Sequence, residues 1–171
     1  MKAVIIYYSK TGFTRRYAQW LAEDLNCPAV PYQRRGSVAL GDYDTVILMG
    51  SLWAGRLLGL DWLKKRLPAL TGKRLAALAV GAAPMDDPEL PGNMASLFGP
   101  VPQVTGFYAQ GGINYEHMGA VDRAMMAMLR AALQKQPDMA DRLAYISRSF
   151  DAADRKYLAP LAAWARGTTG E

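Results

Sequence analysis

The sequence has very few of the residues that form covalent cross-links or metal centres. Its 171 residues include one cysteine, Cys27, and one histidine, His117. A single cysteine excludes an intrachain disulfide and a multi-cysteine metal site, and a single histidine excludes a multi-histidine centre, so we expect no bound metal. The sequence also lacks an apolar run of the roughly 18 residues that span a bilayer, and it shows no signal-peptide pattern. These absences favour a reducing, cytoplasmic setting.

The composition is that of a folded chain. Hydrophobic residues make up 51% and charged residues 20% of the sequence, which excludes intrinsic disorder. The length is close to the size of one domain, so we expect a single domain over residues 1–171.

Positive charge is concentrated in the first half of the chain. Residues 1–75 contain twelve basic and five acidic residues, a net charge of +7, whereas residues 76–171 contain eight and ten, a net charge of −2. A basic half suits anionic ligands such as phosphates. It also fits an ordinary solvated surface, because the basic residues come in pairs rather than in long runs. They are not interleaved with aromatic residues in a nucleic-acid-binding motif, so we expect no nucleic acid partner.

Short apolar segments alternate with segments of helical periodicity. Strands are expected at 2–8, 29–33, 45–49, 75–80 and 104–109, and helices at 13–25, 60–67, 118–132 and 151–166, the last bent near Pro160. Between residues 84 and 100, rich in proline, we expect loop with one helical turn near 94–98. This alternation predicts an α/β fold, a doubly wound parallel sheet of five strands between two helical layers. Ligands of such sheets bind beyond the carboxyl ends of the strands.

The segment after the first strand has the features of a phosphate-binding loop. It leads from a strand into a helix and contains three hydroxyl side chains, a glycine and the free amides of a first helical turn. The loop consists of Ser9, Lys10, Thr11, Gly12, Phe13 and Thr14. It is neither a Walker A loop, because the lysine precedes the glycine, nor a dinucleotide fingerprint, because only one glycine is present. An ordinary helix-capping turn is the alternative.

Residues 9–14 resemble the phosphate loop of the flavodoxin family, Ser/Thr-x-Thr-Gly-x-Thr, and match it at every fixed position. The resemblance implies a flavodoxin-like three-layer sandwich with strand order 2-1-3-4-5 and FMN as the cofactor. It also implies that two further strand-end loops contact the flavin ring. These loops contain Ser51, Leu52, Trp53, Ala54 and Gly55, and Gly81, Ala82 and Ala83, with Gly112 beyond the last strand.

Several of these residues have an alternative structural explanation. Trp53 could form a wall of the ring site or anchor the helix that follows it. The loop 81–85 lacks the aromatic residue that is common there in the family, so Met85 or a backbone plane would have to serve. Cys27 fits a packed residue better than a redox centre, and His117 fits a capping residue better than a proton carrier. Tyr115 could stack on a substrate or cover apolar neighbours.

A second, weaker resemblance concerns residues 111–123. Gly-Gly-x-x-Tyr, followed by a methionine-rich helix with an Asp-Arg pair, is similar to the menaquinone-linked protoporphyrinogen oxidases. It implies a porphyrinogen or quinone substrate. The methionines of this helix step along one face, a pattern that favours core packing but also allows a homodimer or a peripheral membrane contact without requiring either.

These observations predict an FMN-dependent redox protein, with an oxidoreductase favoured over an electron carrier. Carriers of the family are acidic, whereas this chain has a net charge of +5. The electron partner would be a small molecule or a redox protein. The basic first half would favour the anionic reduced flavin and so raise its potential. A non-catalytic binding module of the same fold is the alternative from another class, and no catalytic residue is identified.

Overall fold

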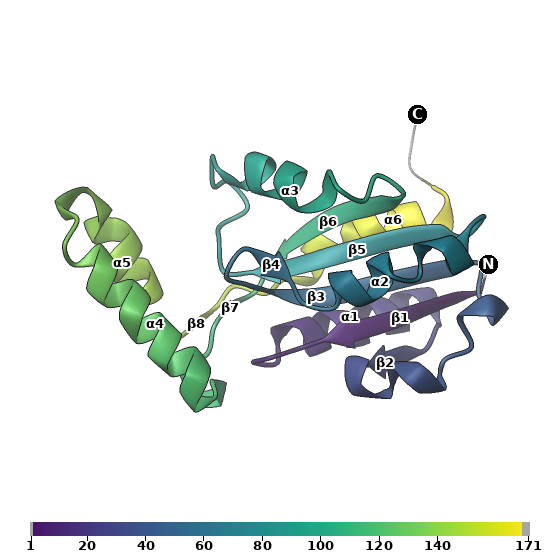
Figure 1. Cartoon of the computed structure of the whole chain (residues 1–171), viewed down its shortest axis with the longest axis horizontal. Helices are drawn as coiled ribbons and strands as arrows, with labels where there is room; N and C mark the ends of the chain where they lie inside the picture. Colours follow the sequence, from purple (N-terminus) through teal and green to yellow (C-terminus); the bar gives the residue numbers. More distant parts are fainter. Residues whose placement is uncertain (1, 169–171) are drawn as a thin grey trace.

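The computed structural model describes residues 2–168, in which a parallel sheet is covered by helices on both faces (Figure 1). Five parallel strands lie side by side in the order β2-β1-β3-β5-β6, and β4 pairs antiparallel with β3. This is the predicted flavodoxin-like order, because β5 and β6 are the fourth and fifth parallel strands along the chain. The bounds are β1 (Ala3–Tyr8), β2 (Ala29–Pro31), β3 (Thr45–Trp53), β4 (Arg56–Leu57), β5 (Arg74–Gly81) and β6 (Val104–Gln110).

The helices divide the core into two layers. Helices α1 (Phe13–Leu25) and α6 (Ala159–Arg166) pack on one face of the sheet, and α2 (Leu60–Lys64) and α3 (Leu90–Phe98) pack on the other. The strands supply both layers because successive side chains point to opposite faces. Val4 and Ile6 lie in the α2–α3 layer, whereas Ile5 between them lies in the α1–α6 layer. Such strands are apolar along their whole length, as the sequence pattern predicted.

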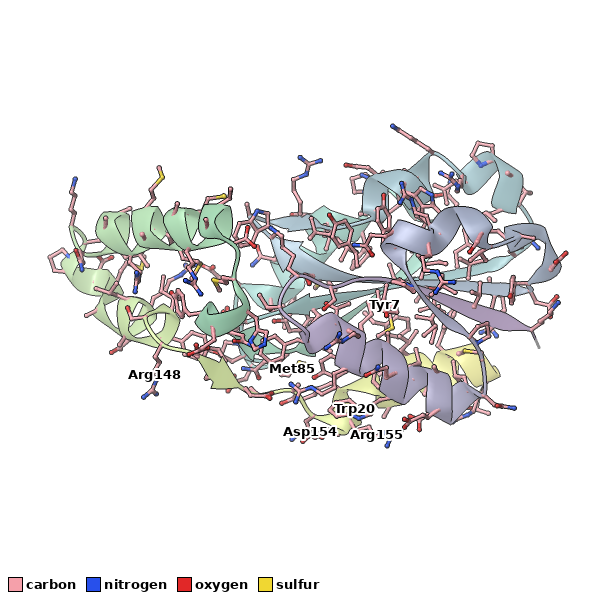
Figure 2. All side chains as sticks on the ribbon, turned by 90° about the horizontal axis from the view of Figure 1, so that it is seen from below. Tyr7, Trp20, Met85, Arg148, Asp154 and Arg155 are labelled. Carbon is pink, nitrogen blue, oxygen red and sulfur yellow. The ribbon has the colours of Figure 1, made fainter. Side chains whose placement is uncertain are left out.

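The segment around Asp154 and Arg155, which leads into α6, is tied to α1 by polar contacts. The buried Tyr17 hydroxyl donates to the carbonyl oxygen of Gln110 at 2.5 Å and accepts from the amide of Asp154 at 3.0 Å. Burial raises the pKa of Tyr17 to about 12. Arg155 forms ion pairs with Glu23 and Asp24. Figure 2 shows Trp20, Asp154 and Arg155 close together where this segment meets α1.

A helical arm leaves the sheet between β6 and the last helix. The two-stranded sheet of β7 (Gly112–Ile113) and β8 (Phe150–Asp151) forms its base, and α4 (Ala120–Leu133) and α5 (Ala140–Ile146) project from it (Figure 1). The arm has a small apolar cluster of its own around Ile113, Leu133 and Ile146. No helix within residues 2–168 is long and apolar enough to cross a membrane.

Proline positions account for most differences from the predicted elements. The expected single turn near 94–98 is a longer helix, α3, because Pro91 lies in its first turn, where a missing amide hydrogen costs nothing. Pro160 likewise lies in the first turn of α6, so it begins that helix instead of bending it. The expected start of this helix at Asp151 is wrong, since that residue belongs to β8. Helix α5 was not predicted.

Candidate functional site

The loop between β1 and α1 presents an open helix N-terminus. Gly12 is the N-cap of α1, with a left-handed φ of 104°, and no side chain within residues 2–168 caps the helix. The Ser9 hydroxyl accepts a hydrogen bond from the Gly12 amide at 3.2 Å, which closes the loop. The first-turn amides of α1 thus have no side-chain partner among the described residues, a geometry that could accept an anionic group.

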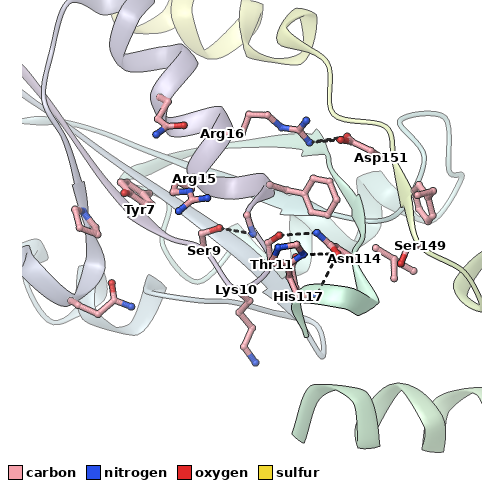
Figure 3. Close-up of a pocket in the computed structure, with 17 residues that line it drawn as sticks. Tyr7, Ser9, Lys10, Thr11, Arg15, Arg16, Asn114, His117, Ser149 and Asp151 are labelled. Carbon is pink, nitrogen blue, oxygen red and sulfur yellow. Dashed lines mark hydrogen bonds and ion pairs between the residues drawn. The ribbon is translucent and has the colours of Figure 1, made fainter. Parts of the chain in front are cut away.

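A polar cavity of about 890 Å³ lies against this loop (Figure 3). Three cations line it. The guanidinium of Arg16 pairs with both carboxylate oxygens of Asp151, at 2.7 and 2.8 Å, and the ammonium of Lys10 pairs with Asp122. Arg15 has no ion-pair partner in the described part of the chain, so its charge is available to a ligand. Asn114 and His117, with 3.0 Å between Oδ1 and Nδ1, also line the cavity, and the Asn114 side-chain amide donates to the carbonyl oxygen of Thr11 at 3.4 Å.

A second cavity, mostly apolar and of about 430 Å³, opens at the carboxyl ends of β3 and β5. Its floor comes from the strand-end segments 51–54 and 80–82, and its cover comes from α4. The covering side chains are those of Met125, Met126 and Leu129 on α4 and of Met118 just before it. Lys10, Thr11, Phe13 and Ile113 line both cavities, so the two spaces meet at the β1–α1 loop.

The methionine-rich helix therefore does not pack into the core as its pattern favoured. Met125 and Met128 are 40% and 73% exposed, because α4 projects from the sheet and has α5 on one side alone. Some of its methionines face the apolar cavity instead. Met85, which the sequence suggested as a wall of the ring site, lines neither cavity and is 41% exposed, whereas Gly81 and Ala82 of the same loop line the apolar cavity.

The segment 51–55 is more regular than a loop. The strand expected to end at Gly50 continues to Trp53, and Ala54 and Gly55, with φ of 48° and 73°, form the two-residue turn of a β3–β4 hairpin. The indole of Trp53 lines the apolar cavity and lies 4.0 Å below the ammonium of Lys10. Ser51 joins this hairpin to α1, since its hydroxyl lies 2.9 Å from that of Thr14.

Most of the sequence-predicted site residues line one of the two cavities. Those lining the polar cavity are Ser9, Lys10, Thr11, Gly12 and Phe13. Those lining the apolar cavity are Lys10, Thr11, Phe13, Ser51, Leu52, Trp53, Ala54, Gly81, Ala82 and Gly112. Thr14 is fully buried beneath the loop, and Gly55 and Ala83 line a neighbouring groove of about 590 Å³.

The arm contributes residues that sequence reasoning did not place at the site. Asp122 is the clearest case, being 9% exposed and in contact with Lys10. Only the heptad-like pattern and the Asp-Arg pair pointed to this helix. The arm is tied to the loop 81–83 by Tyr145, whose hydroxyl donates to the carbonyl oxygen of Ala82 at 2.6 Å. Burial raises the pKa of this tyrosine. Tyr115 packs within the arm, its hydroxyl donating to Ile146.

Cys27 packs among apolar neighbours next to α1, away from both cavities. Burial raises the pKa of its thiol to about 11, because a thiolate is disfavoured where water is excluded. At pH 8 we expect alkylation by iodoacetamide roughly 200-fold slower than for an ordinary cysteine of pKa near 8.5. The measurement compares labelling of native and urea-unfolded protein by mass spectrometry. Equal rates in the two states would contradict the packing seen here.

The family model described as "Flavodoxin domain" matches residues 4–140, more than three quarters of the chain. The chain belongs to the flavodoxin domain family. The match includes the β1–α1 loop and the segments 51–55 and 81–83, so the resemblance of residues 9–14 to that family is confirmed. Membership supports a flavin cofactor and redox function and leaves the substrate open. No curated protein matches the sequence.

Three solved structures show distant likenesses to this chain. The Trp repressor binding protein of Bacillus subtilis is 17% identical, with a TM-score of 0.49 over 77% of this chain and 96% of its own. A flavodoxin from the domain Archaea is 15% identical, with a TM-score of 0.40 over 84% and 99%. An NADPH-quinone reductase from P. pentosaceus is 15% identical, with a TM-score of 0.42 over 85% and 96%. At these values the likenesses do not bear on activity.

Proposed function

We propose that this flavodoxin-domain protein is an FMN-dependent oxidoreductase. The observation that carries the proposal is the meeting of a polar and an apolar cavity at the β1–α1 loop. FMN has a dianionic phosphate and a hydroxylated chain at one end and a flat aromatic ring at the other. A ligand of this kind needs two such spaces in contact, one with anion-binding amides and one with apolar walls.

The residues present suit each end of the cofactor. Ser9, Thr11 and the first-turn amides of α1, with Gly12 allowing close approach, would bind the phosphate, and Arg15 would add positive charge. The hairpin segment 51–54, the segment 81–82 and the α4 methionines would enclose the ring. Bound flavin supplies the one- and two-electron chemistry; the chain's own contribution is to orient it and to exclude water.

The arm favours an enzyme over an electron carrier. Helix α4 covers the apolar cavity, so a protein partner would meet the arm before the ring region, which favours a small planar substrate. By their resemblance, residues 111–123 point to protoporphyrinogen or a quinone as that substrate. If the FMN-loaded protein oxidises neither protoporphyrinogen nor a quinol, and reduces no quinone analogue, this substrate assignment is wrong. That result would favour an electron carrier over an enzyme.

The visible spectrum of the purified protein tests the cofactor. We expect yellow protein that releases FMN on heating, and apoprotein that binds FMN far more tightly than riboflavin, because the phosphate loop contributes to binding. A colourless protein that takes up no added FMN would overturn the proposal and favour a non-catalytic module.

A further inference from the structure

One ion pair connects the phosphate loop to the arm. The ammonium of Lys10 lies 2.6 Å from Oδ1 of Asp122, in the first turn of α4 and 112 positions along the chain. The two side chains are 27% and 12% exposed, so solvent screens them less than a surface pair. Figure 3 shows Lys10 directed away from Ser9 and Thr11 and toward the helix beneath the loop.

The pair occupies a special electrostatic position. Within residues 2–168, Lys10 and Asp122 are the only charged side chains that line the apolar cavity. The ammonium of Lys10 also lies over the Trp53 ring, 4.0 Å from its centroid, and this contact further restricts its position. Any change in the charge of a molecule in this cavity is therefore felt first by these two groups, with opposite signs.

A flavin ring changes charge when it is reduced. On taking two electrons from a reductant such as dithionite and one proton from water, the neutral oxidised ring becomes the anionic reduced ring. A cation at the cavity wall stabilises the reduced form selectively, and an anion there destabilises it. The ratio of the dissociation constants of the two forms sets the potential shift of the bound flavin.

We propose that Lys10 and Asp122 are opposed determinants of the flavin's reduction potential: Lys10 strengthens binding of the reduced flavin, and Asp122 limits that effect. The inference rests on the proposed function, because it assumes flavin in these cavities. The basic first half of the chain was expected to raise the flavin's reduction potential, and the proposal assigns that effect to one residue, Lys10. It also gives the arm, through Asp122, a role in setting the potential in addition to covering the cavity.

The test uses Lys10→Met and Asp122→Asn in the full chain. Dissociation constants of FMN are measured for the oxidised and the dithionite-reduced protein, and midpoint potentials by dye-coupled titration. We expect Lys10→Met to weaken binding of the reduced flavin roughly 10- to 100-fold relative to binding of the oxidised flavin, which lowers the reduction potential. We expect Asp122→Asn to shift the ratio roughly tenfold in the other direction, which raises it.

Matched controls separate this role from a structural one. Lys156→Met and Asp154→Asn remove another lysine–aspartate ion pair, 3.0 Å apart, that lines neither cavity, and should leave the ratio unchanged. Lys10→Arg keeps the cation and should keep the potential. The double variant of Lys10 and Asp122 should return toward the wild-type ratio.

The signs of the potential shifts in Lys10→Met and Asp122→Asn distinguish redox tuning from a purely structural role of the pair. If the pair merely holds α4 in place, both single variants weaken both redox forms and shift the potential together or not at all, and the inference is wrong. If wild-type protein binds no flavin, the proposed function fails and the inference with it. Flavin binding with unchanged ratios overturns the inference alone.

Discussion

Thr11→Glu is expected to remove FMN binding while leaving the fold intact. Thr11 is partly exposed at the open N-terminus of α1, so a longer side chain can be accommodated there. A carboxylate about 5 Å from a phosphate dianion costs about 2 to 7 kcal/mol for effective dielectric constants between 80 and 20. Relative to Thr11→Gln, which matches glutamate in size but is neutral, we expect the Kd for FMN to rise about 30-fold or more.

Riboflavin provides the control ligand for this comparison, because it has the ring and the hydroxylated chain but no phosphate. Its affinity, measured by fluorescence quenching, should be the same in the Glu and Gln variants. Thermal unfolding of the apoproteins should also agree. Equal FMN affinities for the two variants would show that the phosphate does not bind at this loop.

Gly50→Ala is expected to destabilise the fold by an overlap with backbone in the centre of the sheet, next to the site. Gly50 pairs with Tyr8 and Ala79 on either side in the centre of the sheet. A Cβ atom at this position would overlap the backbone carbonyl oxygen of Leu58 and the side chain of Leu57. Because backbone cannot move as easily as a side chain, the overlap should cost about 1 to 3 kcal/mol.

This cost corresponds to a Tm lower by roughly 2 to 12 °C for a chain of this size, measurable by calorimetry. The same displacement would push the β3–β4 hairpin, and with it Trp53, away from its place in the apolar cavity. Gly41→Ala is the matched control, since a Cβ there meets no atom within 4 Å. A Tm for Gly50→Ala equal to that of Gly41→Ala would contradict the packing described here.

The hairpin also shows what the local sequence did not predict. A strand-end loop was expected after Gly50, but β3 continues to Trp53. Gly50 is required instead by the chain's own backbone, and Gly55 by the left-handed turn. Neither reason can be read from spacing, because each depends on a strand pairing that forms only in the folded chain.

Short-range patterns were sufficient for the sheet and for the phosphate loop. Uninterrupted apolar runs such as 45–49 mark strands that are buried on both faces. Hydroxyls, glycine and the start of a helix lie within the six residues 9–14, so their combined chemistry follows from local sequence alone. The strand order came from the resemblance to the flavodoxin family, and the parallel arrangement of the strands brings the loops at their carboxyl ends to one edge.

The arm could not be derived in this way. Its helix α4 has an apolar seam whose partner lies elsewhere in the chain, and the same pattern fits a core helix, an interface or a cavity cover. The ion pair between Lys10 and Asp122 joins residues 112 positions apart, a distance over which propensity and periodicity carry no information. Such contacts form only when the β7–β8 base directs α4 across the sheet's edge. The local sequence of α4 is compatible with several partners for its apolar face, and only long-range packing in the folded chain selects one of them.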